Sequence, residues 1–402
     1  MTTIIVGAGH SGGTAAALLR QNGYADPIIL IGEEPHPPYQ RPPLSKGWLK
    51  GEVDGDGLLL RPSAWYAEAN IDLRTSTRVV SLDRAAKAVT LSTGEVLSYA
   101  KLIIATGARA RRLVLPGSEL NGFLELRTIE DAEAIKARIR PGFRLAVIGG
   151  GYVGLEVAAS ARKLGAEVDV LEREDRLLAR VAGPVLSSFF QQVHEEQGVR
   201  FHFGVTVEGF DGRDGQVSGI RLAGAKPLAC DAVLVGIGAI ANDDLAREAG
   251  LACDNGVVVD HQARTSDPDI FAIGDMTRRP LALYDRSVRL ESVPNALEQA
   301  RQATAAICGK PDPKPDVPWF WSDQYDLKLQ IAGMPFDVDQ IVVRGDPANR
   351  SFAVFHLSRG RVQAVEAVNA APEFMVGRQW IASRREVDPV RLGDVGVPIK
   401  DV

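Results

Sequence analysis

Gly7-Ala8-Gly9-His10-Ser11-Gly12 follows directly on the apolar run Thr3 to Val6 and opens a segment of small residues, Gly12 to Asn22. A second apolar run, Pro27 to Ile31, comes next and leads to the acidic residue Glu33. A buried strand, a glycine turn, a helix and another strand are the parts of a βαβ unit. The chain is therefore predicted to begin with such a unit.

The same order of elements returns further along the chain. It comprises, in sequence, strand Arg144 to Ile148, the turn Gly149-Gly150-Gly151-Tyr152-Val153-Gly154, helix Tyr152 to Leu164, and strand Glu167 to Leu171 followed by Glu172. The distance between the two copies is much longer than a solenoid repeat. We therefore predict that a nucleotide-binding fold occurs twice in this chain.

The glycine spacing has a physical purpose in each copy. The first glycine permits a tight bend, the second lets the backbone approach a pyrophosphate, and the third lets helix and strand pack closely. A carboxylate at the end of the following strand, Glu33 or Glu172, can accept hydrogen bonds from ribose hydroxyls. Glu172 would repel the additional phosphate of NADPH, which favours NADH, although Arg173 and Arg176 could accommodate that phosphate.

Further buried strands are predicted around the two units. They begin the runs Leu102 to Gly107, Ala232 to Gly238 and Ile270 to Asp275, and a helix is expected at Asn295 to Ile307. The proline-rich stretch Gly309 to Pro315 interrupts regular structure and suggests a domain boundary. Beyond it, the pattern predicts an α+β domain with strands Gln340 to Val343, Ser351 to Leu357 and Val362 to Val368 and helix Pro372 to Ser383.

The bulk composition places limits on the function. A chain of 402 residues is too long for one compact core, and 45% hydrophobic with 24% charged residues is typical of a globular protein. No apolar run approaches the roughly 20 residues that span a bilayer, and Thr2 to Leu19 lacks the basic leader of a signal peptide. A net charge of −5 argues against nucleic-acid binding. We expect a cytoplasmic protein that does not bind membranes.

The three cysteines, Cys230, Cys253 and Cys308, lie far apart in the sequence. This spacing fits neither a disulfide framework nor a metal site, so no metal is expected. All three are interpreted as reduced structural residues.

The chain as a whole resembles the FAD-dependent pyridine nucleotide oxidoreductases, and among them the ferredoxin reductases of bacterial oxygenase systems. The motifs that carry the resemblance are Gly7 to Gly12, Arg41 to Lys46, Ala105 to Gly107, Leu126 to Thr128, Gly149 to Glu156, Gly236 to Gly238, Ala272 to Asp275, Glu291 to Val293 and Trp319 to Gln324. The resemblance implies an α/β, glutathione reductase-like fold with two Rossmann-like domains, the second inserted in the first, and a C-terminal α+β domain.

The resemblance also implies domain boundaries and cofactor contacts. Residues 1–110 and 240–310 would bind FAD non-covalently, residues 111–239 would bind NADH, and residues 311–402 would form a C-terminal interface domain. The implied FAD contacts are Gly7, Gly9, Ser11, Gly12, Glu33, Arg41, Lys46, Val79, Thr106, Gly107, Arg127, Asp275, Val293 and Trp321. The implied NADH contacts are Gly149, Gly151, Gly154, Glu156, Glu172, Arg180 and Gly238. His10, inside the first turn, is interpreted as structural.

Lys46 and Glu156 match a pair that the family places beside the flavin, and they are the predicted catalytic residues. A buried cation could stabilise reduced flavin, and the carboxylate could orient the lysine or the nicotinamide amide. The alternative is that both are ordinary surface charges.

The lack of closely spaced cysteines limits the classes of electron acceptor that this protein could reduce. Disulfide reductases of this superfamily need two cysteines within bonding reach, and the related oxidases and peroxidases use one in the N-terminal domain. No cysteine precedes Cys230. The resemblance therefore points to a small acidic [2Fe-2S] ferredoxin that supplies a cytochrome P450 or Rieske oxygenase. The alternatives are an NADH oxidase or a reductase of quinone or another small acceptor, and an NADH-responsive redox binding protein.

Basic residues around the FAD-binding segment are candidate docking charges for an acidic ferredoxin. They are Arg278, Arg279, Arg286, Arg289, Arg301 and Lys310. The aromatic cluster Trp319 to Trp321 could belong to the core, an interface or the flavin surroundings. We expect a monomer or a weak dimer.

Overall fold

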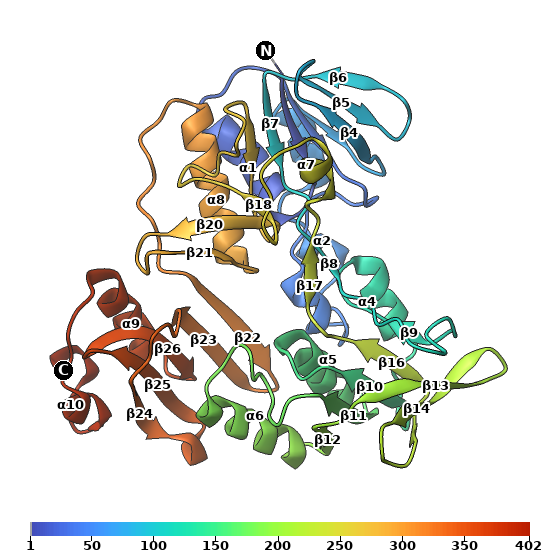
Figure 1. The fold of residues 1–402 in the computed structure, drawn as a ribbon, viewed down its shortest axis with the longest axis vertical. Coiled ribbons are helices and arrows are strands. Elements are labelled where there is room, and N and C mark those ends of the chain that lie inside the picture. Colours follow the sequence, from blue (N-terminus) through green and yellow to red (C-terminus); the bar gives the residue numbers. More distant parts are fainter. Residues whose placement is uncertain (1) are drawn as a thin grey trace. The chain divides into compact units, whose positions relative to one another are not determined.

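The computed structural model describes residues 2–402, which form two compact units, and each is treated separately (Figure 1). The first unit contains the residues up to Arg41, together with Gly55–Arg109 and Ile240–Phe320. The second contains Pro42–Asp54, Ala110–Ala239 and Trp321–Val402. The predicted division into three domains is finer than these two units and stays a prediction.

A parallel sheet of five strands forms the centre of the first unit. Its order is β19 (Ile270–Ala272), β7 (Lys101–Ile104), β1 (Thr3–Val6), β2 (Ile28–Ile31) and β3 (Ile71–Arg74). Thr3 pairs with Ile28 on one side and with Lys101 on the other. These strands read as continuous apolar runs because a parallel sheet is covered on both faces.

Successive side chains of β1 serve the two faces in turn, as strand geometry requires. Ile5 packs with Ala15 and Ala16 of α1 (His10–Gln21) and with Ala300 of α8 (Val293–Ile307). Ile4 and Val6 pack against the opposite cluster, which includes residues of the antiparallel sheet β4 (Val79–Asp83), β5 (Ala88–Leu91) and β6 (Val96–Ser98). Figure 1 shows α1 and α8 side by side in this unit.

The second unit repeats this plan with different residues. Its parallel sheet has the order β12 (Val199–Phe203), β11 (Glu167–Glu172), β10 (Arg144–Ile148), β16 (Ala232–Val235) and β9 (Phe123–Leu124). Helix α5 (Tyr152–Lys163) packs on β10 and β11. An antiparallel sheet of β13 (Val207–Arg213), β14 (Gln216–Leu222) and β15 (Leu228–Ala229) shares an apolar cluster with the parallel sheet. The predicted duplication of the fold is confirmed.

The C-terminal part of the chain forms an antiparallel sheet of five strands. Its order is β22 (Trp319–Gln324), β23 (Leu327–Gly333), β26 (Arg361–Val368), β25 (Ser351–Ser358) and β24 (Gln340–Asp346). Helix α9 (Ala371–Ser383) packs on β26 and β23. The predicted α+β character is confirmed, but β22 and β23 were not predicted, because a two-residue turn joins them without a glycine or proline signal.

Two helices begin earlier than the sequence analysis predicted. Helix α1 starts at His10 because Gly9 is already in the extended conformation of an N-cap. Helix α8 starts at Val293, where the Ser292 side chain accepts a hydrogen bond from the Asn295 backbone N–H.

The remaining elements are short or connect the sheets. They are η1 (Pro42–Ser45), α2 (Gly55–Leu58), α3 (Ser63–Glu68), β8 (Ala108–Ala110), α4 (Ile129–Lys136), α6 (Pro184–Glu196), β17 (Ala239–Ala241), α7 (Asp244–Glu248), β18 (Val257–Val258), β20 (Thr277–Leu281), β21 (Arg286–Arg289), η2 (Pro347–Asn349), α10 (Pro389–Gly393) and η3 (Ile399–Asp401). Among the helices within residues 2–402, none has the length and apolar composition required to cross a membrane.

One predicted docking charge is wrong. The Arg279 side chain on β20 is buried, and its guanidinium donates to both carboxylate oxygens of Glu298 on α8, at 2.9 and 3.1 Å. It also donates to the Asn295 side chain. Arg279 therefore joins β20 to α8 inside the first unit and cannot meet a partner at the surface.

Replacing Arg279 should destabilise the protein strongly. Arg279→Ala leaves the Glu298 carboxylate buried without its cation, and breaking such a pair costs about 3–5 kcal/mol of unfolding free energy. The exposed Arg301 on α8 provides the matched control, for which Arg301→Ala should change that free energy by less than about 0.5 kcal/mol. Denaturant unfolding of both variants measures the difference; equal stabilities would contradict the assigned role.

Candidate functional site: two glycine turns and a buried ion pair

The first glycine turn has the geometry of a phosphate cradle. Gly7 has φ +112°, and a Cβ there would lie 2.2 Å from the Ala105 carbonyl oxygen. A Cβ on Gly12 would lie 1.9 Å from the Gly7 carbonyl oxygen, so helix and strand are in contact there. At Gly9, by contrast, a Cβ would have no atom within 4 Å. The open space lies at the one glycine that must admit a pyrophosphate.

The second turn repeats this geometry. Gly149 has φ +103°, and a Cβ there would lie 2.5 Å from the Gly236 carbonyl oxygen. A Cβ on Gly154 would lie 2.7 Å from the Gly149 carbonyl oxygen, whereas one on Gly151 would meet its nearest atom only at 4.0 Å. Each turn also opens directly into the N-terminus of a helix, α1 or α5, where backbone N–H groups favour an anion.

Polar groups of the first unit gather at the first turn. Ser11 is buried, and its Oγ would be only 2.8 Å from a Cβ on Gly274, so the loop carrying Asp275 runs beside the turn. Burial lowers the pKa of His10, an effect that Asp275 opposes. His10 Nδ1 is buried and has no partner among the residues that the structure describes. An orphaned nitrogen at this position fits a site completed by a bound group.

The segment that follows β7 is fixed against the same turn. Thr106 Oγ1 donates to the Asn242 carbonyl oxygen at 2.7 Å, and the Asn242 side chain donates to the Thr106 carbonyl oxygen at 2.9 Å. Gly107 follows with φ +65°. Both residues are thereby held in fixed backbone positions next to Gly7.

Arg41 and the two glutamates after β2 have distinct positions. The Arg41 guanidinium donates to Glu34 at 2.5 Å and to the Tyr39 hydroxyl at 2.8 Å. The Glu33 side chain is 71% exposed and lies 3.7 Å from Arg78. The Glu33 carboxylate is therefore accessible to a ribose, whereas the Glu34 carboxylate is bound to the Arg41 guanidinium.

The other predicted FAD contacts lie on several elements. Val79 is buried in an apolar cluster at the start of β4, and Val293 is the first residue of α8. The Arg127 backbone N–H donates to Asp131 at the start of α4, and Trp321 is a half-buried residue of β22. Their roles toward FAD stay predictions.

Glu172 is held rigidly at the second turn. Its carboxylate accepts hydrogen bonds from the backbone N–H of Gly150, at 2.7 Å, and of Glu174, at 3.0 Å. Arg176, the residue suggested for a 2′-phosphate, donates instead to Ser187 and to the carbonyl oxygens of Ala179 and Ala182. Arg176 is thus engaged by its surroundings, whereas Arg173, the other arginine suggested for a 2′-phosphate, is 79% exposed.

The predicted NADH contacts Gly238 and Arg180 are also brought together. Gly238 has φ +99°, and a Cβ there would lie 3.9 Å from the guanidinium of Arg180, which is exposed. The strand end that contains Gly236 borders Gly149. These residues therefore line the same edge of the parallel sheet as the turn.

Lys46 and Glu156 form an ion pair in the second unit, in which Glu156 is buried and Lys46 is half-buried. Lys46 Nζ lies 2.6 Å from Glu156 Oε2, and the two side chains are 17% and 7% exposed. Lys46 follows η1, and Glu156 lies in the first turns of α5, two residues after Gly154. The surface-charge alternative does not hold for this pair.

Three serines around this pair were not predicted. Ser45 Oγ donates to Glu156 Oε2 at 2.5 Å, and Ser322 Oγ donates to Glu156 Oε1 at 2.6 Å. Ser160 Oγ donates to the Ser45 carbonyl oxygen at 2.7 Å and so ties η1 to α5. Ser45 and Ser322 do lie in the motifs quoted above, but no local spacing connects residues so distant along the chain.

The state of the three cysteines bears on the choice of electron acceptor. All three are free thiols, and burial raises the pKa of Cys230 to about 12. Burial also raises the pKa of Cys253 and of Cys308. Neutral thiols are poor nucleophiles, which agrees with their structural interpretation.

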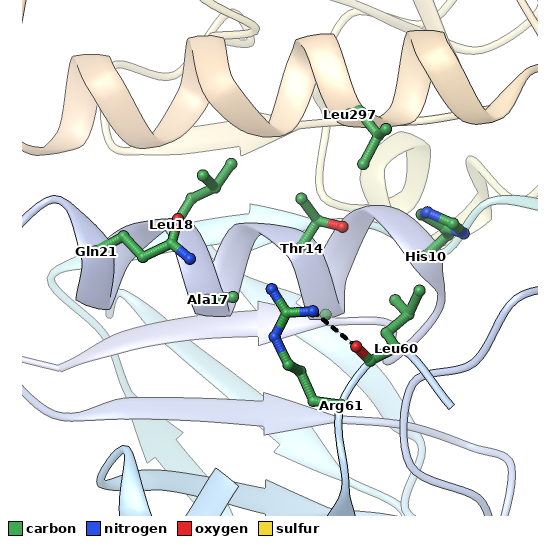
Figure 2. A pocket seen from close by; sticks show the side chains of 9 residues that line it. His10, Thr14, Ala17, Leu18, Gln21, Leu60, Arg61 and Leu297 are labelled. Carbon is green, nitrogen blue, oxygen red and sulfur yellow. Dashed lines mark hydrogen bonds between the residues drawn. The ribbon is translucent and has the colours of Figure 1, made fainter. Parts of the chain in front are cut away.

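A groove of about 230 Å³ runs along α1 in the first unit (Figure 2). His10, Thr14 and Leu18 lie on one side of it and Leu297 of α8 on the other. Arg61, at its rim, donates to the Leu60 carbonyl oxygen. The groove lies on the side of α1, and its lining combines the apolar side chains Ala17, Leu18, Leu60 and Leu297 with the polar ones His10, Thr14, Gln21 and Arg61.

Alanine substitutions should separate the packing glycines from the ligand-facing ones. Gly9→Ala, at φ −82°, adds a methyl group to open space, so it should preserve stability to within about 1 kcal/mol but reduce the bound flavin. Gly12→Ala forces a clash and should destabilise by at least about 1–3 kcal/mol. Thermal unfolding and the flavin absorbance of the purified variants measure both effects. Full flavin content in a stable Gly9→Ala protein would contradict the assignment.

Comparisons with known proteins agree with this geometry. Residues 1–300 match the family described as pyridine nucleotide-disulphide oxidoreductase, and residues 319–402 match the reductase C-terminal family. The chain is 53% identical over 397 residues to a probable ferredoxin reductase of Castellaniella defragrans, covering 98% of this chain and 97% of that protein. It is 43% identical over 404 residues to putidaredoxin reductase of Pseudomonas putida, with 99% and 96% covered.

A solved structure is similarly close. The crystal structure of the covalent putidaredoxin reductase–putidaredoxin complex matches with a TM-score of 0.97 and 43% identity, covering 99% of this chain and 97% of that one. The match confirms the predicted fold class, in which two nucleotide-binding folds precede a C-terminal α+β part. The chain therefore belongs to the pyridine nucleotide-disulphide oxidoreductase family and carries its reductase C-terminal domain.

Proposed function

We propose that this protein is an NADH-dependent ferredoxin reductase, which passes electrons from NADH through FAD to a [2Fe-2S] ferredoxin of a cytochrome P450 or Rieske oxygenase system. The observation that carries the proposal is the presence of two open glycine cradles in a chain without paired thiols. The relatives named above, a probable ferredoxin reductase and putidaredoxin reductase, support this choice of acceptor.

The residues of the first unit fit FAD. The cradle at Gly9 would admit its pyrophosphate, Asp275 and Arg41 are the polar groups beside the turn, and Thr106 has a fixed backbone. FAD, when bound, supplies the ability to accept a hydride and to release electrons singly. The task of this chain is to bind, orient and shield the reacting groups.

The residues of the second unit fit NADH. Gly151 leaves room for the pyrophosphate, and Glu172 presents a fixed carboxylate to the adenosine ribose. Glu156, two residues beyond the third glycine of this turn, then forms an ion pair with the half-buried Lys46. We assign them to orientation of the nicotinamide and to stabilisation of negative charge during transfer.

An acidic ferredoxin would be attracted by basic side chains of the first unit. Arg286, Arg301 and Lys310 are exposed, whereas Arg279 is internal. Arg278 lies 3.3 Å from Asp254, and Arg289 is bound to Glu291. Such charges act mainly on the association rate. The cytoplasmic location and the monomeric or weakly dimeric state stay predictions.

Ferredoxin should be required for fast electron transfer to a one-electron acceptor. With NADH as donor, cytochrome c reduction should rise at least about tenfold when a [2Fe-2S] ferredoxin is added, and salt should weaken this stimulation by screening the docking charges. Oxygen consumption without ferredoxin is the control. Fast NADH oxidation that no ferredoxin stimulates would favour the oxidase or small-acceptor alternative instead.

Lys46→Ala should slow the reduction of bound flavin by NADH. Removing the cation leaves the Glu156 carboxylate uncompensated, and a loss of about 1.4 kcal/mol of transition-state stabilisation lowers the rate about tenfold. Lys50, which pairs with Glu52 in the same segment, gives the matched control Lys50→Ala. Stopped-flow absorbance measures both variants, and unchanged kinetics in Lys46→Ala would remove Lys46 from the mechanism.

A further inference from the structure

A continuous chain of hydrogen bonds leads from Glu156 to the turn between β22 and β23. Ser322 Oγ lies 2.6 Å from Glu156 Oε1, and Gln324 Nε2 lies 3.1 Å from Ser322 Oγ. Gln324 Oε1 lies 2.8 Å from Nε2 of His194 on α6, whose Nδ1 lies 3.1 Å from the Tyr325 hydroxyl. Three segments that are distant in sequence, in α5, α6 and β22, thus meet in one network within the second unit.

The Glu156 carboxylate, which is paired with Lys46, sets the direction of every bond in this chain. An ionised carboxylate only accepts, so Ser322 must give its single proton to Glu156 and accept from the Gln324 amide N–H. The Gln324 carbonyl then faces His194, whose Nε2 must carry the proton, and Nδ1 accepts from the Tyr325 hydroxyl. Burial lowers the pKa of His194 to about 4, which agrees with a neutral ring. All donors therefore point toward Glu156.

Four members of the chain are shielded from water, and only Tyr325 at its end is half-buried. Glu156 is 6% exposed, Gln324 is 1% exposed, and Ser322 and His194 are fully buried. The His194 ring packs edge-on against the rings of Phe201 and Tyr325. Buried polar groups cost free energy unless they are hydrogen-bonded, and a chain aligned in one direction polarises its members cooperatively.

The Tyr325 backbone shows that the end of the chain is constrained. Tyr325 has φ +56°, a left-handed conformation that is uncommon for a bulky residue. Such conformations persist where the surrounding structure fixes them. Tyr325 is the first residue of the two-residue hairpin turn between β22 and β23, which requires a positive φ there and so fixes the residue that carries the first donor of the chain.

We propose that Ser322, Gln324 and His194 are positioning residues that hold the Glu156 carboxylate correctly oriented, and through it fix Lys46 for transfer between nicotinamide and flavin. This inference rests on the proposed function. Lys46 and Ser45 both engage Oε2 of Glu156, so Ser322 is the side chain that holds the other oxygen. Without it, the carboxylate can rotate, and Lys46 keeps only its longer contacts with the Pro42 carbonyl oxygen and the Ser45 hydroxyl, both at 3.2 Å.

The test is rapid-reaction reduction of the FAD-loaded enzyme by NADH, which separates the limiting rate from NADH affinity. Ser322→Ala and His194→Phe should each lower the limiting rate about tenfold while changing the NADH dissociation constant by less than about twofold. Ser322→Thr keeps the hydroxyl and His194→Gln keeps a donor toward Gln324, so both should restore most of the rate. His202→Phe, which changes a histidine of β12 bound to Asp169, is the control and should react like the wild type.

A double-variant cycle tests whether the residues act through Glu156. In a Glu156→Gln background, Ser322→Ala should cause little additional loss, because the carboxylate that Ser322 orients is already gone. Additive effects, no rescue by the conservative variants, or a change confined to NADH affinity would overturn the proposal. If His194→Phe fails to fold, the smaller Ser322→Ala change still decides the question. Failure of NADH to reduce the wild-type flavin would instead refute the proposed function.

Discussion

A buried carboxylate that is paired with a lysine imposes the strictest constraint on the second unit. Glu156 lies inside the protein, where a charge without partners would cost several kcal/mol. Its two oxygens therefore collect Lys46, Ser45 and Ser322, which come from η1 and β22. The Glu156 side chain of α5 thus obtains its hydrogen-bond and ion-pair partners only because the segment after Arg41, the nucleotide-binding fold and the C-terminal sheet meet at the same place.

The glycine turns impose the second constraint, and their glycines fall into two groups, one required for packing and one for ligand binding. In both copies the first and third glycines are enclosed by backbone, so they serve the fold. Only Gly9 and Gly151 face open space, and only there would a methyl group obstruct a ligand without disturbing the strand–helix contact. The same short motif therefore carries a packing requirement and a binding requirement at different positions.

Charged residues that look alike in sequence have different roles in the structure. Arg279 is internal and supports α8, although it stands next to Arg278, which is paired with Asp254. Arg176 is held by its own loop, whereas Arg173 is 79% exposed. In each case two features determine the role of the arginine: how far its side chain is buried, and whether a carbonyl or carboxylate oxygen lies close to it. Neither feature can be predicted from the local sequence.

The sequence by itself determined the duplicated βαβ plan, the positions of most parallel strands and the family of the chain, because glycine spacing and apolar runs are local signals. It also indicated Lys46 and Glu156, through motifs that resemble known ones. Only the tertiary structure decided that these two residues meet, that Ser322, Gln324 and His194 form a hydrogen-bonded chain leading to Glu156, and that Arg279 is internal. These features depend on contacts between residues more than a hundred positions apart or on burial by another element, and no local pattern records such contacts.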